Sequence, residues 1–340
     1  MQTYSKFNEI HRVFGCLAGK NSYLSSLLRP AFLPNITISL RNSIGVPCLT
    51  PTRLYQYMAG KRIGTLLDPP ILNEGLGAQV RRSIGSSQLR HLDPFLLVDH
   101  YFIDPPHGFP THPHRGFQGI YYVLSGALLY DNNKGQSGTL MPGDVQCLTM
   151  GKGILHAQGA GQAGTQGITI WLNQKGDTRL CPATSVDITA ATVPKVQLPG
   201  AVAEVLAGPF GGAQGPCITN AACQVLLITM QAGSQLRLES PSEVTAMLYV
   251  IPGEVNVEGQ VVSHYQLAVF ENIGEVINFQ AQTDSKVLFL QAPRLGEPSV
   301  QYGPYVMSSR DEVLAAQVDF NHSQNGFEGA QAWQSRLDIR

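Results

Sequence analysis

The sequence is poor in charged residues, and its cysteines form no recognisable site. Only 14% of its 340 residues are charged, and the formal net charge of −1 provides no overall attraction to nucleic acid or to an anionic membrane. The six cysteines are scattered without a C-x-x-C pair, which argues against a zinc ribbon, a thioredoxin-type site or a dense disulfide framework. No apolar run approaches the roughly 18 residues of a membrane span. We therefore expect a cytoplasmic protein that binds neither nucleic acid directly nor a membrane.

Residues 1–62 almost lack acidic side chains, since Glu9 is the single acid beside eight lysines and arginines. A basic, hydroxyl-rich and acid-poor leader is typical of an organelle transit peptide. Two other interpretations stay open: a flexible extension, or residues upstream of the true start with Met58 as the initiator. None of the three gives the leader a visible chemical role.

Glycine and proline are abundant, with 35 and 22 residues, which favours short strands joined by tight turns over a helical bundle. From about Ile63 onwards, β-branched and aromatic runs of strand length alternate with glycine-containing turns. The segment Met247–Gly259 repeats the pattern of Ile120–Asn132, which is an apolar strand, a turn that ends in glycine and a second strand. The sequence therefore predicts an all-β fold with two copies of one barrel, over residues 63–182 and 183–340.

The chain is predicted to end with a helix. The segment Ser309–Glu312 has the sequence of a capping box, in which a serine side chain caps the first turn. Val313, Ala316 and Phe320 follow at helical spacing, so they fall on one face. We expect this helix to pack on a barrel as a brace.

Three histidines are spaced so that they could share a metal ion. Residues two apart in a strand project to the same face, which applies to His112 and His114 and again to His156 and Gln158. Pro113 cannot donate a hydrogen bond to a ladder and therefore places its segment at a strand start or edge. Two such pairs from facing strands would bring four side chains to one ion, and imidazole suits zinc, iron, nickel or copper. The second repeat has no H-x-H motif, so the site belongs to the first.

The stretch from about Gly75 to Leu172 resembles the N-terminal cupin domain of the pirin family. The matching segments are GLGAQVRRSIG, HLDPFLLVDH, GFPTHPHRGFQ, MPGDVQCLTMGKGILHAQ and ITIWLN, and GEPSVQYGPYVM near the end resembles a late family motif. The resemblance implies two jelly-roll-like cupin β-barrels stacked face to face, with one iron-type metal in the first. The family's ligands, three histidines and one glutamate, fall on His112, His114, His156 and the position of Gln158. We expect a divalent metal, iron first, with zinc, nickel, manganese or copper as alternatives.

The sequence departs from the family pattern at three positions. Gln158 replaces the usual glutamate ligand, and Gln118 replaces the carboxylate that usually follows HPHRGF, so the pocket is expected to contain two amides. Cys147 stands where the family tends to have a large residue. A glutamine oxygen is a neutral and weaker ligand, so we expect weak metal retention and a preference for reduced iron. An amide also cannot act as a base.

Two residues ahead of the histidine motif are candidates for a substitute proton acceptor. These are His107, which we place in the pocket, and Asp104; polar residues in an exposed loop are the simpler interpretation of both. Arg115 could bind an anionic substrate, but we interpret it as structural.

Three functions are compatible with these residues. The first is a metal-binding regulatory or binding module for a small phenolic ligand or a protein partner. The second is a quercetin 2,3-dioxygenase-like enzyme, an activity that the resemblance implies. The third is a degenerate cupin without metal. The two glutamines favour the first, because they remove the carboxylate that would accept a substrate proton.

Overall fold

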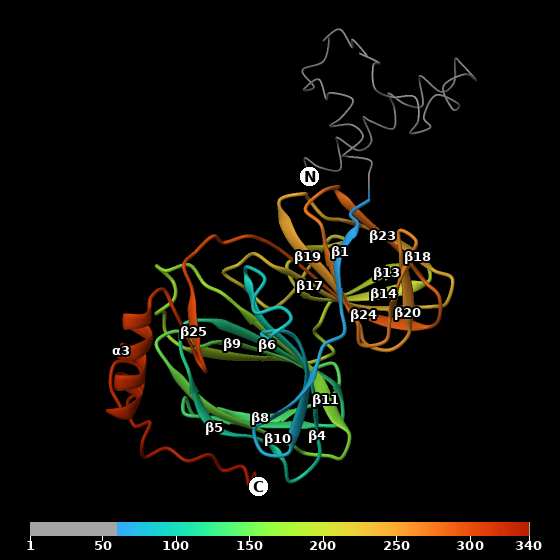
Figure 1. The fold of residues 1–340 in the computed structure, drawn as a ribbon. Coiled ribbons are helices and arrows are strands. Elements are labelled where there is room, and N and C mark those ends of the chain that lie inside the picture. Colours follow the sequence, from blue (N-terminus) through green and yellow to red (C-terminus); the bar gives the residue numbers. More distant parts are fainter. Residues whose placement is uncertain (1–59, 340) are drawn as a thin grey trace, which may run out of the picture. The chain divides into compact units, whose positions relative to one another are not determined.

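The computed structural model describes residues 60–339, and this part of the chain forms two barrels, each made of a seven-stranded and a four-stranded antiparallel sheet (Figure 1). The predicted all-β, two-cupin fold is therefore confirmed, whereas nearly all of the basic leader lies outside the described residues. In spatial order, the large sheet of the first barrel contains β12 (Thr184–Ile188), β9 (Val145–Thr149), β6 (Gln118–Ser125), β11 (Thr165–Leu172), β4 (Phe95–Ile103), β3 (Ala78–Ile84) and β2 (Ile71–Glu74). Its small sheet contains β5 (Gly108–His114), β10 (Ile154–Ala160), β7 (Leu128–Asn132) and β8 (Ser137–Leu140).

The second barrel repeats this plan and fills its interior with apolar side chains, among them Leu226, Leu248 and Phe289. Its large sheet contains β1 (Ile63–Leu67), β22 (Leu267–Phe270), β19 (Val244–Val250), β24 (Ser285–Pro293), β17 (Gln224–Met230), β14 (Ala201–Ala207) and β13 (Lys195–Leu198). Its small sheet contains β18 (Gln235–Glu239), β23 (Val276–Ala281), β20 (Glu254–Val257) and β21 (Gln260–Ser263). Two short ribbons and one helix complete the described chain: β15 (Pro209–Phe210) with β16 (Ala213–Gln214), β25 (Val300–Tyr302) with β26 (Tyr305–Met307), and α3 (Arg310–Asn321).

The barrels exchange edge strands, so the predicted boundaries at residues 63 and 183 do not follow the sheets. Strand β1 pairs with β22 of the second barrel, and Figure 1 shows β1 in blue among the strands of that barrel. Strand β12 instead pairs with β9 of the first barrel. The physical reason is that the edge of a sheet has free N–H and C=O groups that another strand can pair with. The edge of the second barrel's large sheet pairs with β1, and the edge of the first barrel's large sheet pairs with β12.

Strand alternation separates the two faces of the first barrel's large sheet. On β11, Ile168, Ile170 and Leu172 pack in a buried apolar cluster with residues of the second barrel. Thr169 and Trp171 point to the opposite face and line a cavity inside the first barrel. The sheet therefore uses one face to join the barrels and the other to build a pocket.

A disulfide bond also joins the barrels, between Cys147 on β9 and Cys217. The two cysteines are 70 positions apart, so only the packing of the barrels brings them together. Cys181 and Cys223 are free thiols, whereas Cys16 and Cys48 lie outside the described residues. The expectation of no dense disulfide framework agrees with these four cysteines, but no pattern in the sequence indicated this single bond.

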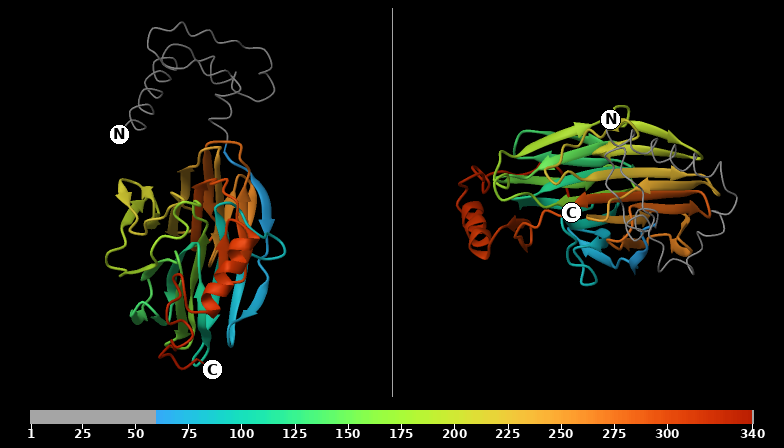
Figure 2. Two further views of the ribbon diagram at one scale, coloured as in Figure 1. Left: turned by 90° about the vertical axis from the view of Figure 1, so that its left-hand side faces the viewer. Right: turned by 90° about the horizontal axis from the view of Figure 1, so that it is seen from above.

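The C-terminal helix α3 has the predicted cap and face. The Ser309 side chain accepts a hydrogen bond from the Glu312 backbone N–H, which makes it the N-cap. Val313 and Ala316 are buried, and Phe320 packs beside them in a cluster with residues of β26 and β10. Figure 2 shows the helix at the side of the first barrel. The helix is therefore a brace, as predicted.

Candidate metal centre

The three predicted histidines converge inside the first barrel. His112 and His114 lie on β5, and the neighbouring strand β10 places His156 directly opposite His112. The Nε2 atoms of His112 and His156 are 3.0 Å apart, and one ring nitrogen from each of the three residues lies within 4.8 Å of the others. Two ligands at right angles on a metal with bonds of about 2.1 Å would lie about 3.0 Å apart. The spacing therefore fits a shared ion.

Backbone carbonyl groups orient two of these rings. The Nδ1 atom of His112 lies 2.7 Å from the carbonyl oxygen of Pro110, and that of His114 lies 3.4 Å from the carbonyl oxygen of Pro304. A carbonyl oxygen can only accept, so each Nδ1 donates a proton and each Nε2 keeps its lone pair. Such hydrogen bonds fix the tautomer that a metal requires.

Burial keeps the three imidazoles neutral. It lowers the pKa of His112 and lowers the pKa values of His114 and His156 well below the ordinary value, and the neighbouring histidines lower the latter two further. Because an imidazole must be neutral to bind a metal, the site is prepared for an ion at neutral pH.

Acidification should therefore destabilise the metal-free protein. The pKa of a buried histidine is lowered in the folded state, so the unfolded chain binds more protons below about pH 6.5 and the free energy of unfolding falls with pH. We expect His156→Gln to reduce this fall by about 1 kcal/mol between pH 7.5 and pH 5.5. Urea unfolding in the presence of a chelator measures the effect.

The wild type must be compared with His156→Gln because protonation of Asp99 changes the free energy of unfolding in the opposite direction. Burial raises the pKa of Asp99 to about 6, so its protonation stabilises the folded state as the pH falls from 6 towards 4. That contribution is common to both proteins, so it drops out of the difference. An identical pH dependence in both would show that His156 is not held neutral.

Gln158 lies beside the histidines, as its spacing from His156 predicts. It is 5% exposed, lines the cavity, and its Nε2 atom has no hydrogen-bond partner among residues 60–339. Buried polar groups normally have hydrogen-bond partners, so the amide nitrogen of Gln158 is available to a group that binds in the cavity. Its oxygen can serve as a neutral fourth ligand. The donor set of three imidazoles and one amide thus fits a divalent metal ion.

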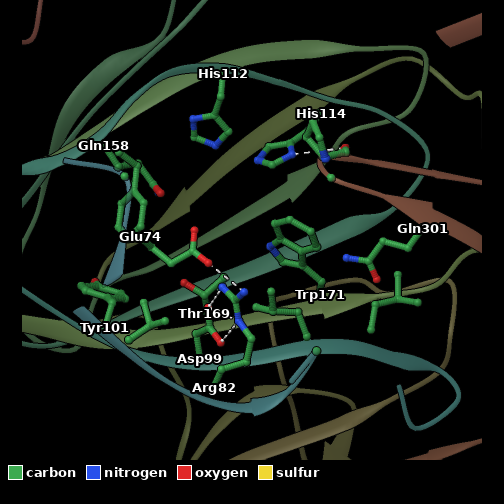
Figure 3. A pocket seen from close by; sticks show the side chains of 18 of the residues that line it. Glu74, Arg82, Asp99, Tyr101, His112, His114, Gln158, Thr169, Trp171 and Gln301 are labelled. Atoms are coloured by element: carbon green, nitrogen blue, oxygen red, sulfur yellow. Dashed lines mark hydrogen bonds and ion pairs between the residues drawn. The ribbon is translucent and has the colours of Figure 1, made fainter. Parts of the chain in front are cut away.

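The cavity extends from the histidines across the barrel and has a volume of about 1010 Å³. Opposite the histidines, Arg82 lies between two carboxylates: its Nη1 atom is 2.8 Å from Glu74 Oε1, and its Nη2 atom is 2.7 Å from Asp99 Oδ2 (Figure 3). Trp171 forms an aromatic wall and contacts the ring of His114 edge-on. The pocket combines a metal-binding wall, an aromatic wall and a charged wall.

Sequence reasoning missed the charged wall. Arg82 and Asp99 are direct cross-strand neighbours on β3 and β4. Both lie in segments that match the pirin motifs, but neither belongs to a motif with a recognised chemistry. Their opposite charges in two neighbouring segments of the chain were the signal that could have revealed the pair.

The prediction that Gln118 belongs to the pocket is wrong. Gln118 shares a face of β6 with Ile120 and Tyr122, which pack towards the second barrel. Its Nε2 atom donates to the carbonyl oxygen of Ile218, and its Oε1 atom accepts from the backbone N–H of Asn220. Gln118 therefore links the barrels, and only one of the two amides faces the metal site.

His107 and Asp104 are also absent from the described lining of the cavity. The ring of His107 packs against Gly77, where a Cβ atom would lie 2.3 Å from the ring. Asp104 accepts a hydrogen bond from the backbone N–H of Gly164 and so holds a loop. Neither is placed to take a proton from a ligand in the pocket, and the placement of His107 there is corrected.

Arg115 is structural, as predicted. Its guanidinium donates to the carbonyl oxygens of Lys152 and Asn325, pairs with Asp319 at 2.8 Å, and stacks on the ring of Phe327. It thus ties the histidine strand to the end of α3 and the following turn.

A three-histidine pocket in the first of two cupin barrels defines a metal-binding bicupin, and known proteins agree with this class. The family model Pirin matches residues 77–172, and the Pirin C-terminal cupin domain matches residues 225–326. Pirin-like protein 2 of Arabidopsis thaliana is 34% identical over 274 residues, which are 77% of this chain and 85% of that protein. Pirin of Homo sapiens is 31% identical over 272 residues, 78% and 94% of the two chains. The chain belongs to the pirin family.

Solved structures share the fold. Quercetin 2,3-dioxygenase from Acinetobacter baumannii is 27% identical with a TM-score of 0.74, and the match covers 80% of this chain and 100% of that one. The bacterial pirin YhhW from Escherichia coli, in complex with nickel(II), has a TM-score of 0.57 at 17% identity, covering 68% and 100% of the two chains. At that identity the second likeness concerns the fold alone. Within residues 60–339, no helix has the length and hydrophobicity to span a membrane.

Proposed function

We propose that this protein binds iron(II) through His112, His114, His156 and Gln158 and holds a small phenolic ligand beside the ion. The observation that carries the proposal is the group of three converging imidazoles, with His114 and His156 buried and His112 partly buried, at one wall of a cavity of about 1010 Å³. That volume suits an aromatic molecule of modest size, and Trp171 offers a flat surface to it. In this proposal the protein is a binding or regulatory module rather than an efficient enzyme.

The neutral fourth ligand supports both parts of the proposal. An amide donor leaves the full charge of a divalent ion uncompensated, which favours the reduced state of iron and weakens retention. A bound divalent ion would act as a Lewis acid on a ligand oxygen. The amide of Gln158 cannot remove a proton from that ligand.

A second function, oxidation of a flavonol with molecular oxygen, is supported by the likeness to quercetin 2,3-dioxygenase. The aromatic wall and the carboxylates of the cavity are compatible with it. The two functions differ in turnover rather than in the site that they use. Cytoplasmic location and the absence of direct nucleic-acid binding stay predictions.

Metal analysis tests the shared basis of both functions. We expect about one divalent ion per chain in protein purified without an affinity tag from iron-supplemented cells, with anomalous scattering at the histidines. An empty pocket under these conditions would favour the degenerate cupin.

Gln158→Glu separates binding from turnover. A carboxylate at this position compensates part of the metal charge, so we expect metal affinity to rise about 10-fold or more and oxygen uptake with quercetin to increase. Oxygen-electrode measurements and competition with a chelator give the two values. Gln301→Glu is the matched control, because Gln301 lines the same cavity but is not one of the proposed ligands (Figure 3). Unchanged oxygen uptake in metal-loaded Gln158→Glu would contradict the dioxygenase function and leave the binding module as the function of the protein.

A further inference from the structure

Glu74 presents a carboxylate to the cavity from the side that also carries Gln158 and Tyr101, with the carboxylate towards Arg82 (Figure 3). It ends strand β2, and its side chain is 37% exposed. Arg82 pairs with its Oε1 atom at 2.8 Å, and no hydrogen bond or ion pair of its Oε2 atom is found within residues 60–339. One carboxylate oxygen is therefore held in place while the other is open to the cavity.

Three other polar side chains of the cavity, those of Asp99, Tyr101 and Gln158, are less available to a ligand proton than Glu74. Asp99 has both oxygens engaged by Arg82, through Nε at 3.0 Å and Nη2 at 2.7 Å. Burial raises the pKa of Tyr101 far above its ordinary value, so the hydroxyl keeps its proton. Gln158 is an amide without basic character. Among the described lining residues, Glu74 is the carboxylate with an available oxygen.

Two buried polar atoms near Glu74 indicate that a ligand binds there. The hydroxyl of Tyr101 and the Nε2 atom of Gln158 line the same cavity, and neither has a hydrogen-bond partner among the described residues. Both residues are at least nine-tenths buried. In Figure 3 they lie on the same side of the cavity as Glu74. Each can donate a hydrogen bond, so together with the carboxylate they match a ligand that carries oxygen acceptors and a hydroxyl donor.

We propose that Glu74 accepts the proton of a ligand hydroxyl group and so binds the phenolic ligand as its anion. The inference rests on the proposed function. It assigns to Glu74 the role of proton acceptor, which the amide of Gln158 cannot fill. In the transfer, the ligand O–H bond breaks, a proton bonds to Glu74 Oε2, and the electron pair stays on the ligand oxygen. No oxidant is needed.

The electrostatics of the two walls favour this transfer. Arg82 shares one positive charge between Glu74 and Asp99, so these three side chains carry an excess of negative charge that a proton would neutralise. The other titratable side chains of this lining outside the metal-binding wall, apart from tyrosines, are Arg90 and His91, and both are exposed. The negative charge moves to the ligand, which faces the metal-binding wall. The charge of Glu74 already acts across the cavity, since it raises the pKa of His112 and partly offsets burial.

Absorption of bound quercetin tests the proposal, because the flavonol spectrum shifts to longer wavelength on ionisation. Zinc-loaded protein without oxygen serves as host, because zinc is redox-inactive. We expect bound quercetin to ionise about one pH unit or more below free quercetin. Glu74→Gln should remove part of that shift with metal content unchanged, and the rest comes from the metal. Glu74→Asp should restore part of it, and Glu271→Gln, an exposed acid outside the cavity, should have no effect.

The outcomes distinguish this inference from the proposed function. Wild-type protein that binds neither metal nor quercetin would overturn the proposed function itself. Bound quercetin that ionises equally in Glu74→Gln and in the wild type would overturn only the role of Glu74. If Glu74→Gln does not fold, the wild type alone tests the proposal. Quercetin that is bound in its neutral form about one pH unit below the ionisation of free quercetin would contradict it.

Discussion

Replacing His112 or His156 with alanine is expected to remove most of the bound metal and to leave the fold intact. The two Nε2 atoms, 3.0 Å apart, face the same point, so each variant leaves two imidazoles and a neutral amide for the ion. Loss of groups that merely orient metal ligands weakens binding about 10- to 100-fold, so loss of a ligand should weaken it by at least about 100-fold. Elemental analysis of untagged protein measures metal per chain.

The fold should persist because the barrel depends on its strands rather than on the ion. Strands β5 and β10 are held by their ladder, and a buried apolar cluster that includes Val80, Ile103 and Leu128 packs in the same barrel. Circular dichroism and urea unfolding check this point. His264→Ala is the control, since His264 is an exposed histidine of the second barrel that stacks on Tyr265. Full metal content in His156→Ala would place the ion elsewhere.

Arg115→Ala should destabilise the protein far more than the loss of either histidine, by about 3–5 kcal/mol in the free energy of unfolding. The side chain is 4% exposed, and its removal leaves Asp319 without its cation and two carbonyl oxygens without a donor. It also removes the cation that stacks on Phe327. Urea unfolding monitored by circular dichroism gives the difference.

A surface arginine provides the matched control for that measurement. Arg237 lies on β18 with an exposed side chain, so Arg237→Ala should change the free energy of unfolding by no more than about 0.5 kcal/mol. If Arg115→Ala behaved like Arg237→Ala, the links between the histidine strand and the end of α3 would be energetically unimportant. We would then expect metal affinity to be unaffected as well.

Local periodicity predicted the parts of the site that depend on a single strand. Alternation along β5 and β10 correctly brought His112, His114 and His156 together and placed Gln158 in the cavity. The capping residues of α3 were equally readable, because Ser309 and Glu312 interact within one turn.

Features that depend on how sheets pack could not be predicted in this way. Alternation along β6 says that Gln118 shares a face with Ile120, but not whether that face meets the cavity or the second barrel. The partner of Cys147 and the position of Glu74 depend likewise on contacts between distant segments. The exchange of β1 and β12 between the barrels cannot be predicted from the composition of either strand.

Because the chain crosses between its barrels and then returns, the pocket is not a portable module. A fragment that ends at residue 182 would lack β12, would carry β1 without β22, and would lack the Pro304 carbonyl that orients His114 from 190 positions downstream. Dissecting the protein into halves, or grafting its first half onto another scaffold, should therefore yield an imperfect metal-binding wall. The second barrel, in which the described residues form no histidine cluster, therefore contributes to the geometry of the metal-binding wall in the first.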